Sequence, residues 1–306
     1  MKKKWKLVII ISSAVLLVLG VLTVTVVIPV VGKTLMLHPK HEEMYMYPHE
    51  KGMTYENVTI TTSDNVGLKA WWIEPESLAD PNSNITLIVL HGFSHSKAWM
   101  LDHYGDGFYD SGYRMLFIDS RNRGESPDTE LGVTWGIDEK KDLRAAVDFV
   151  KDQPEVNDSQ VAIFAESQGA ATLIFYTAEY NDVAAIIPDS SWAEGKAMIK
   201  QAYPIRAGFP WFIFGQITIK MLENHFGFPF EDISPINHMV TITTPTYLIH
   251  GQVDTNYPPS HCQDLHDALP DSTNKEIWIT PNRDHVESYL ELNYFSNIED
   301  FITSNI

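Results

Sequence analysis

A serine stands between small residues where an apolar strand pattern gives way to a helical one. Residues 161–165 are uniformly apolar, Glu166-Ser167-Gln168-Gly169 follows, and a helical pattern then runs to about residue 180. A nucleophilic serine is presented on such a sharp turn, where the strand and the helix come close together and small residues must flank the serine. The usual G-x-S-x-G form here has Ala165 in its first position. We expect Ser167 to be a nucleophile, although a serine here could also simply cap the helix.

An acid and a histidine follow Ser167 at the ends of two later strand patterns. Asp254 comes soon after the pattern at 246–250, and His285 comes soon after the pattern at 276–280. A neutral histidine can accept the proton of a serine hydroxyl near pH 7. A carboxylate fixes the tautomer of that histidine and stabilises its protonated form. The order and placement predict a Ser167, His285 and Asp254 catalytic triad.

Two other carboxylates are alternatives for the acid. Asp189 follows the strand pattern at 183–188, and Asp284 directly precedes His285. Adjacent residues rarely orient each other's side chains well, which makes Asp284 the weaker candidate. We therefore expect Asp254 to be the acid.

Two backbone N–H groups are candidates for holding the oxyanion that forms when the serine attacks a carbonyl. One belongs to Phe93, in the His-Gly-Phe sequence after the strand pattern at 85–90, and the other to Gln168, directly after the serine. The single cysteine, Cys262, excludes a cysteine-cluster metal site. We expect neither a metal nor an organic cofactor.

Strand patterns alternate with helical patterns of 10–15 residues, which predicts an α/β fold with a mostly parallel sheet covered on both faces. The first two strand patterns form a hairpin. The predicted strands are 58–62, 68–74, 85–90, 113–119, 161–165, 183–188, 246–250 and 276–280. The predicted helices are 96–110, 138–152, 168–180, 259–269 and 286–302.

One segment interrupts this alternation. Nine aromatic residues and three prolines lie between Trp192 and Phe230. An insertion of this size after a sheet strand predicts a helical cap over about residues 191–240. We expect its rings to form a core for the cap, and some of them also to line an apolar substrate pocket.

The amino terminus has the pattern of a membrane anchor. Four lysines within residues 1–6 precede residues 7–31, which carry no charge. This stretch is longer than the apolar part of a secretory signal and ends without a small-residue cleavage site. We predict a cytoplasmic tail (1–6), a transmembrane helix (7–31), a stem (32–56) and an extracytoplasmic domain (57–306), with residues 1–33 serving only for attachment. A leader that is cleaved off and a buried helix of a soluble protein are the alternatives.

The overall charge excludes one class of partner. The chain has 22 basic and 40 acidic residues, a net charge of -18. Nucleic-acid binding requires clustered basic residues, so no nucleic-acid partner is expected. The sequence leaves the oligomeric state open.

Residues 58–306 resemble the alpha/beta-hydrolase superfamily, especially bacterial membrane-anchored or secreted serine hydrolases with one N-terminal helix. Besides the triad, residues 119–126 are similar to its D-x-R-x-x-G-x-S turn, and residues 248–251 and 257–258 are similar to its acid loop. Ala165 and Asp284 depart from the pattern.

The resemblance implies an alpha/beta-hydrolase fold and a membrane-anchored, extracytoplasmic serine hydrolase. Its substrate would be a small carboxylic ester or another acyl compound. A serine peptidase, a thioesterase or a non-catalytic binding protein of the same fold are the alternatives.

Overall fold

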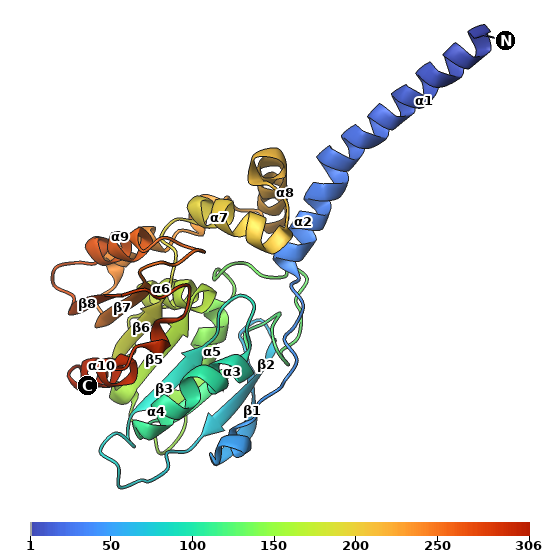
Figure 1. Ribbon diagram of the computed structural model, residues 1–306. Helices are drawn as coiled ribbons and strands as arrows, with labels where there is room; N and C mark the ends of the chain where they lie inside the picture. Colours follow the sequence, from blue (N-terminus) through green and yellow to red (C-terminus); the bar gives the residue numbers. More distant parts are fainter. Residues whose placement is uncertain (1) are drawn as a thin grey trace.

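An eight-stranded sheet forms the centre of the computed structural model, which describes residues 2–306 (Figure 1). The strand order is β1-β2-β4-β3-β5-β6-β7-β8. β1 and β2 form an antiparallel hairpin, β2 is antiparallel to β4, and all other neighbours are parallel. The strands are β1 Tyr55–Thr61, β2 Gly67–Ile73, β3 Thr86–Leu90, β4 Arg114–Ile118, β5 Val161–Glu166, β6 Ala185–Asp189, β7 Thr246–Gly251 and β8 Lys275–Thr280.

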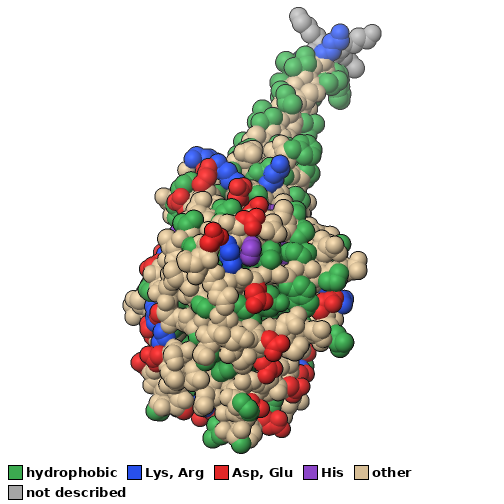
Figure 2. Space-filling model, turned by 90° about the vertical axis from the view of Figure 1, so that its left-hand side faces the viewer, with side chains coloured by type: hydrophobic (Ala, Val, Ile, Leu, Met, Phe, Trp, Pro, Cys, Tyr) green, Lys and Arg blue, Asp and Glu red, His purple; other side chains and the backbone are tan. Residues whose placement is uncertain are grey.

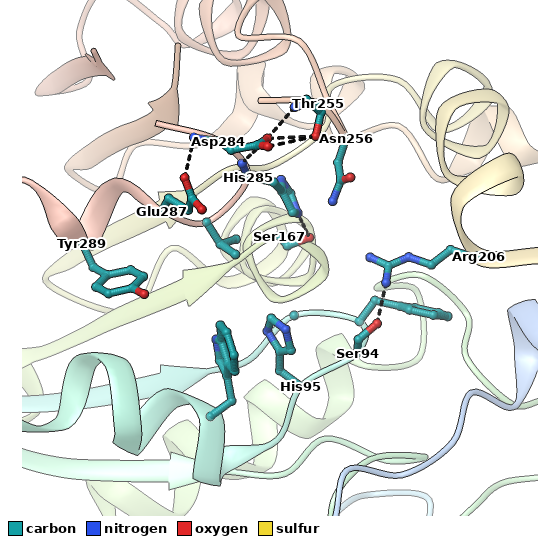
Figure 3. Close-up of a pocket in the computed structure, with 14 residues that line it drawn as sticks. Ser94, His95, Ser167, Arg206, Thr255, Asn256, Asp284, His285, Glu287 and Tyr289 are labelled. Carbon is teal, nitrogen blue, oxygen red and sulfur yellow. Dashed lines mark hydrogen bonds between the residues drawn. The ribbon is translucent and has the colours of Figure 1, made fainter. Parts of the chain in front are cut away.

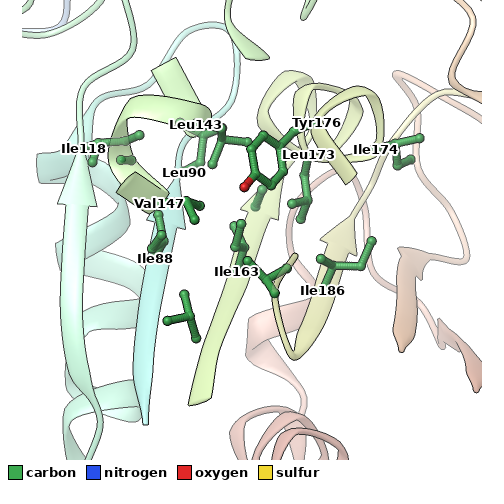
Figure 4. Close-up of a cluster of buried hydrophobic side chains, with 14 of the residues drawn as sticks. Ile88, Leu90, Ile118, Leu143, Val147, Ile163, Leu173, Ile174, Tyr176 and Ile186 are labelled. Atoms are coloured by element: carbon green, nitrogen blue, oxygen red, sulfur yellow. The ribbon is translucent and has the colours of Figure 1, made fainter. Parts of the chain in front are cut away.

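Helices cover both faces of the sheet because successive side chains of each strand point to opposite sides. In β3, Ile88 packs on the face that carries α5, α6 and α9, whereas Val89 packs on the face that carries α3, α4 and α10. Figure 4 shows the first of these two cores, where Val147 of α5 lies beside Ile88 and Leu143 lies beside Leu90. The helices are α3 Lys97–Met100, α4 Asp106–Asp110, α5 Lys140–Lys151, α6 Gln168–Tyr180, α9 Ser260–Ala268 and α10 Tyr294–Thr303.

The α/β class and all eight predicted strands are confirmed, with ends that shift by up to three residues. The closing helix differs, because it begins at Tyr294 and not near residue 286. Val286 has a φ of 53°, a left-handed conformation that a helix cannot contain. The residues after His285 therefore form a loop with one 3₁₀ turn, η9 (Ser288–Leu290).

The cap lies between β6 and β7 and consists of a helical hairpin. Its two helices, α7 (Gly195–Ala207) and α8 (Gln216–Phe226), are joined through the π-helical turn η5 (Trp211–Gly215). The predicted aromatic core is present, because Trp192, Phe226 and Phe230 are buried together. The remaining short turns are η2 Pro48–Lys51, η3 Leu101–Gly105, η4 Asp158–Gln160, η6 Phe230–Asp232, η7 Pro235–Asn237 and η8 Met239–Thr241.

The amino-terminal segment is one long helix made of α1 (Lys2–Leu22), the turn η1 (Thr23–Val27) and α2 (Ile28–Leu37). Its first part projects away from the domain, and α2 packs against α7 and α8 (Figure 1). The helix thus ends at Leu37, six residues into the predicted stem. Residues 28–37, the last part of this long helix, therefore belong to the packed cap.

The contact between α2 and α7 is close at Gly32. A Cβ atom at this position would lie 2.7 Å from the hydroxyl oxygen of Tyr203. Further along α2, the side chains of Met36 and Leu37 are buried in the cap core. The expectation that residues 1–33 serve only for attachment therefore differs from the structure, because Pro29 and Gly32 are buried against the cap.

Candidate active site

Ser167 occupies the sharp turn between β5 and α6. Its φ and ψ of 50° and -113° lie in a region that non-glycine residues rarely adopt, so surrounding contacts must hold it. The Ser167 N–H donates to the carbonyl of Asp189 at 2.8 Å. Close packing explains the small residue that follows, because a Cβ at Gly169 would lie 2.6 Å from the carbonyl oxygen of His91.

His285 lies between Ser167 and Asp254. Its Nε2 is 2.9 Å from Oγ of Ser167, and its Nδ1 is 2.7 Å from Oδ2 of Asp254. The other oxygen of Asp254 accepts the N–H groups of Asn256 and Tyr257, both at 2.8 Å. The three predicted side chains therefore meet in the arrangement of a catalytic triad, with Ser167 and His285 facing the open pocket of Figure 3.

A second histidine supports Asp254 from the buried side. His250 Nε2 is 3.1 Å from Oδ2 of Asp254 and 2.9 Å from the carbonyl oxygen of Tyr257. Burial by itself would raise the pKa of Asp254, but hydrogen bonds from His250 and His285 lower that pKa well below its usual range. Asp254 is thus held as a carboxylate. We did not predict this role for His250. A histidine at the end of an apolar strand is unusual, and this could have indicated a buried polar partner.

The two alternative acids support the backbone around His285. The buried Asp189 carboxylate accepts the hydroxyls of Ser190 (2.8 Å) and Tyr294 (2.7 Å), and burial raises its pKa. Asp284 accepts the N–H groups of Thr255 and His285, each at 2.7 Å. Within residues 4–306, Asp254 is the carboxylate in hydrogen-bond contact with the His285 ring.

The two predicted oxyanion donors belong to the residue after the serine and to a loop that lines the same pocket. Gln168 is the first residue of α6, where a helix leaves its N–H groups unpaired. Phe93 follows Gly92 in the loop after β3 and lines the pocket beside Ser167. Neither N–H has a backbone acceptor in the described part of the chain. Both donors are thus free to bind a negatively charged oxygen.

Glu166 joins the Phe93 loop to the serine turn. Its fully buried carboxylate accepts hydrogen bonds from His95 Nδ1 (2.6 Å), the Gly92 N–H (3.2 Å) and the Tyr104 hydroxyl (3.2 Å). Burial opposes ionisation, but the interaction with His95 lowers the pKa of Glu166 below its usual value. This role was missed, although a carboxylate that ends an apolar strand was its signal.

The pocket above the triad has a volume of about 360 Å³ and a mixed polar lining. The cap contributes Arg206, which donates to Oγ of Ser94 and lies 4.9 Å from the Phe93 ring centroid (Figure 3). The lining residues are Gly92, Phe93, Ser94, His95, Trp99, Ser167, Arg206, Thr255, Asn256, Asp284, His285, Val286, Glu287 and Tyr289.

None of the nine cap aromatics lines this pocket, so the expectation that some of them would do so is wrong for it. Trp192, Phe226 and Phe230 fill the cap core, and Tyr203 packs against α2. The long amino-terminal helix therefore packs against cap aromatics that the sequence pattern had led us to expect in the substrate pocket.

Comparisons with known proteins agree with this architecture. A family model described as serine aminopeptidase, S33, matches residues 81–223. Protein bem46 of Schizosaccharomyces pombe is 25% identical over 260 residues, which cover 84% of this chain and 80% of bem46. The Saccharomyces cerevisiae membrane protein YNL320W is 20% identical over 258 residues, which cover 83% and 82% of the two chains.

A solved structure extends the similarity over nearly the whole domain. The esterase Pf2001 of Pyrococcus furiosus superposes with a TM-score of 0.71 at 25% identity, covering 88% of this chain and 97% of the esterase. Together with the sheet order and the serine turn, these similarities show that the chain has the alpha/beta-hydrolase fold.

Proposed function

We propose that this alpha/beta hydrolase cleaves small carboxylic esters through a Ser167, His285 and Asp254 triad and an acyl-enzyme intermediate. The observation that carries the proposal is the position of His285, with Nε2 at 2.9 Å from the serine oxygen and Nδ1 at 2.7 Å from the aspartate. The similarity to an esterase supports the choice of substrate.

In the proposed reaction, Oγ of Ser167 attacks the ester carbonyl while Nε2 of His285 takes the hydroxyl proton. The N–H groups of Phe93 and Gln168 stabilise the oxyanion. When the ester bond breaks, His285 gives its proton to the departing alcohol. A water molecule, deprotonated by His285, then attacks the acyl-serine and releases the carboxylic acid and Ser167.

A peptide bond is the second candidate substrate, because the matching family model is described as a serine aminopeptidase. An aminopeptidase must bind the charged α-amino group of its substrate, and a carboxylate without other partners in the pocket is the group best suited to do so. In this pocket, Asp284 already accepts two N–H groups and Glu287 accepts the Asp284 N–H, while Arg206 adds a positive charge. Because both carboxylates already bind backbone N–H groups, the pocket favours an ester. A thioester would follow the same chemistry.

The proposed location is a membrane, with the hydrolase domain on the extracytoplasmic side. The helix Lys4–Leu37 is apolar and long enough to cross a bilayer. The lysines before Leu7 orient it with the short tail in the cytoplasm. The similarity to a yeast membrane protein supports attachment.

Replacement of the nucleophile tests the proposal. We expect Ser167→Ala to lose labelling by a fluorophosphonate probe and to keep only a residual rate on p-nitrophenyl esters, because the oxyanion donors remain. Ser304→Ala, at an exposed position, is the matched control and should retain full activity. Wild-type turnover by Ser167→Ala would refute the assignment.

A substrate panel separates the two candidates. The full chain is assayed with p-nitrophenyl esters of increasing acyl length and with aminoacyl p-nitroanilides. We expect kcat/KM to be higher for the esters by at least about a hundredfold. Faster cleavage of the anilides would favour the aminopeptidase, and probe labelling without turnover of either would overturn the ester assignment.

A further inference from the structure

The part of the long helix that stands free of the domain has the length of a bilayer. Side chains 4–27 are all exposed, and Ile28 is the first that the cap partly covers. The uncharged residues from Leu7 to Val27 span about 31 Å at 1.5 Å per residue. The hydrocarbon core of a bilayer is about 30 Å thick. If this segment spans the membrane, the cap therefore begins where the hydrocarbon ends.

The cap exposes apolar side chains at this level. We call residues 205–216, which join α7 to α8, the cap tip. Phe209 and Trp211 of the tip pack in the same cluster as Ile28. Phe212 is 82% exposed, Ile205 52% and Ile213 43%. These side chains continue the apolar surface of the helix onto the domain, and aromatic residues are common at this depth of a membrane protein.

The charge of the cap hairpin is opposite to that of the chain. The hairpin, residues 195–226, contains four basic residues and one acidic residue, Glu223, whereas the chain carries -18. Three of the four, Lys196, Lys200 and Lys220, border a groove of about 410 Å³ with Trp211. Figure 2 shows basic side chains, with acidic ones beside them, at the end of the domain from which the helix emerges.

Two of these lysines have acidic neighbours on the cap. Lys196 pairs with Glu231, and Lys220 lies 3.4 Å from Glu223. Lys200 forms no ion pair within residues 4–306. A basic, apolar tip on an acidic protein matches the chemistry of a surface that carries anionic lipid headgroups.

We propose that the cap tip rests on the bilayer, with Phe212 and Ile213 among the headgroups of anionic lipids and the lysines of α7 and α8 facing the lipid phosphates. This inference rests on the proposed membrane anchoring. It places the hairpin that carries Arg206, a residue of the catalytic pocket, against the membrane. Esters that partition into the bilayer surface are then the substrate class nearest the site.

Spin labels on the full chain in lipid nanodiscs test the proposal. Single cysteines are introduced as Phe212→Cys and Ile213→Cys in the tip. Leu292→Cys, at an apolar side chain that is 99% exposed, is the matched control, and Leu16→Cys reports the anchor itself. Cys262 is 1% exposed and burial raises the pKa of its thiol, so the native cysteine reacts poorly with the label.

For each spin label, we compare its accessibility to oxygen, which concentrates in lipid, with its accessibility to a water-soluble nickel chelate. In discs of phosphatidylcholine and phosphatidylglycerol we expect nickel accessibility at 212 and 213 at least about fivefold below that at 292, with oxygen accessibility retained. Nickel accessibility equal to that at 292 would overturn the proposal. Protection from both reagents would also overturn it, because it would indicate contact with a second copy of the chain.

Two further arms keep the conclusions separate. A label at 16 that is accessible to nickel would refute the anchoring and with it the inference. A label at 16 that is protected from nickel, together with a label at 212 that is accessible to nickel, would refute the inference alone. Equal values at 212 in discs with and without phosphatidylglycerol would refute the role of anionic lipid. Fluorophosphonate labelling of the same samples reports on Ser167 independently.

Discussion

Asp254 differs from the two other carboxylates near His285 in the atom that it contacts. Asp254 accepts from the ring, whereas Asp189 and Asp284 accept from hydroxyl and backbone groups. Asp254→Asn removes the charge that stabilises the imidazolium, a change that cost on the order of 10⁴ in turnover in another triad enzyme. We expect Asp254→Asn to lose at least about 10²-fold in kcat.

The matched variants Asp189→Asn and Asp284→Asn should each stay within about tenfold of the wild type, or roughly 1.4 kcal/mol of barrier. All three are compared as kcat at saturating ester, after circular dichroism has shown that each variant folds. A crippled Asp189→Asn beside an active Asp254→Asn would assign the acid to Asp189 and leave the serine assignment in place.

His91 makes the loop that carries Phe93 sensitive to acid. Its Nδ1–H donates to the Gly92 carbonyl at 2.8 Å, and its Nε2 accepts the Ser120 N–H at 3.1 Å, so the ring must be neutral. Burial lowers its pKa from 6.5 to about 4. Between these pH values the unfolded chain binds a proton that the folded chain excludes, and the free energy of unfolding falls as the pH falls.

The shift corresponds to roughly 3 kcal/mol lost between pH 6.5 and pH 4. Urea unfolding across this range should show a smaller loss for His91→Gln, which has a donor and an acceptor but does not titrate. The exposed His49→Gln is the control and should follow the wild type. Identical pH profiles for His91→Gln and the wild type would contradict the prediction.

At the scale of elements, short apolar runs were enough to predict the inner strands β3 to β7, because these are buried at every position. The outer strands β1 and β8 are only partly buried, and their β-rich composition indicated them. The same reasoning placed Ser167, Asp254 and His285 together, since parallel strands end at one edge of the sheet. It could not predict that Glu166 binds the loop after β3, because such contacts join segments far apart in sequence. The closing helix was misplaced because periodicity does not report the positive φ of Val286.

The crossing of α2 and α7 offers a test of packing between elements. Ala is favoured over Gly within a helix by about 1 kcal/mol. In Gly32→Ala the new methyl group collides with the buried Tyr203 hydroxyl, whereas at Gly20 no atom lies within 4 Å. Overpacking costs about 1–3 kcal/mol. We expect a lower unfolding temperature for Gly32→Ala than for Gly20→Ala, measured by tryptophan fluorescence in nanodiscs. Equal values would contradict the contact.

At the scale of the whole molecule, the amino-terminal helix serves two parts of the structure. The uncharged residues 7–31 predicted an anchor, but this pattern does not show where the helix begins to pack against the cap. The border lies near Ile28, because the cap covers the helix from there to Leu37. Pattern alone could not locate it, since lipid and a protein core are both apolar surroundings.

Truncation on either side of this border gives the last prediction. A chain that begins at Ile28 keeps the buried side chains of α2, whereas a chain that begins at His38 loses Met36 and Leu37 from the cap core. Burial of one such side chain contributes about 1.5–3 kcal/mol. The shorter chain should therefore unfold at a lower temperature, and its cap should be cut faster by trypsin at Lys200 and Arg206. Both chains should be released from membranes by carbonate, whereas the full chain should resist this treatment. If the chain from His38 is as stable as the chain from Ile28, α2 is only an attachment, as its sequence alone had indicated.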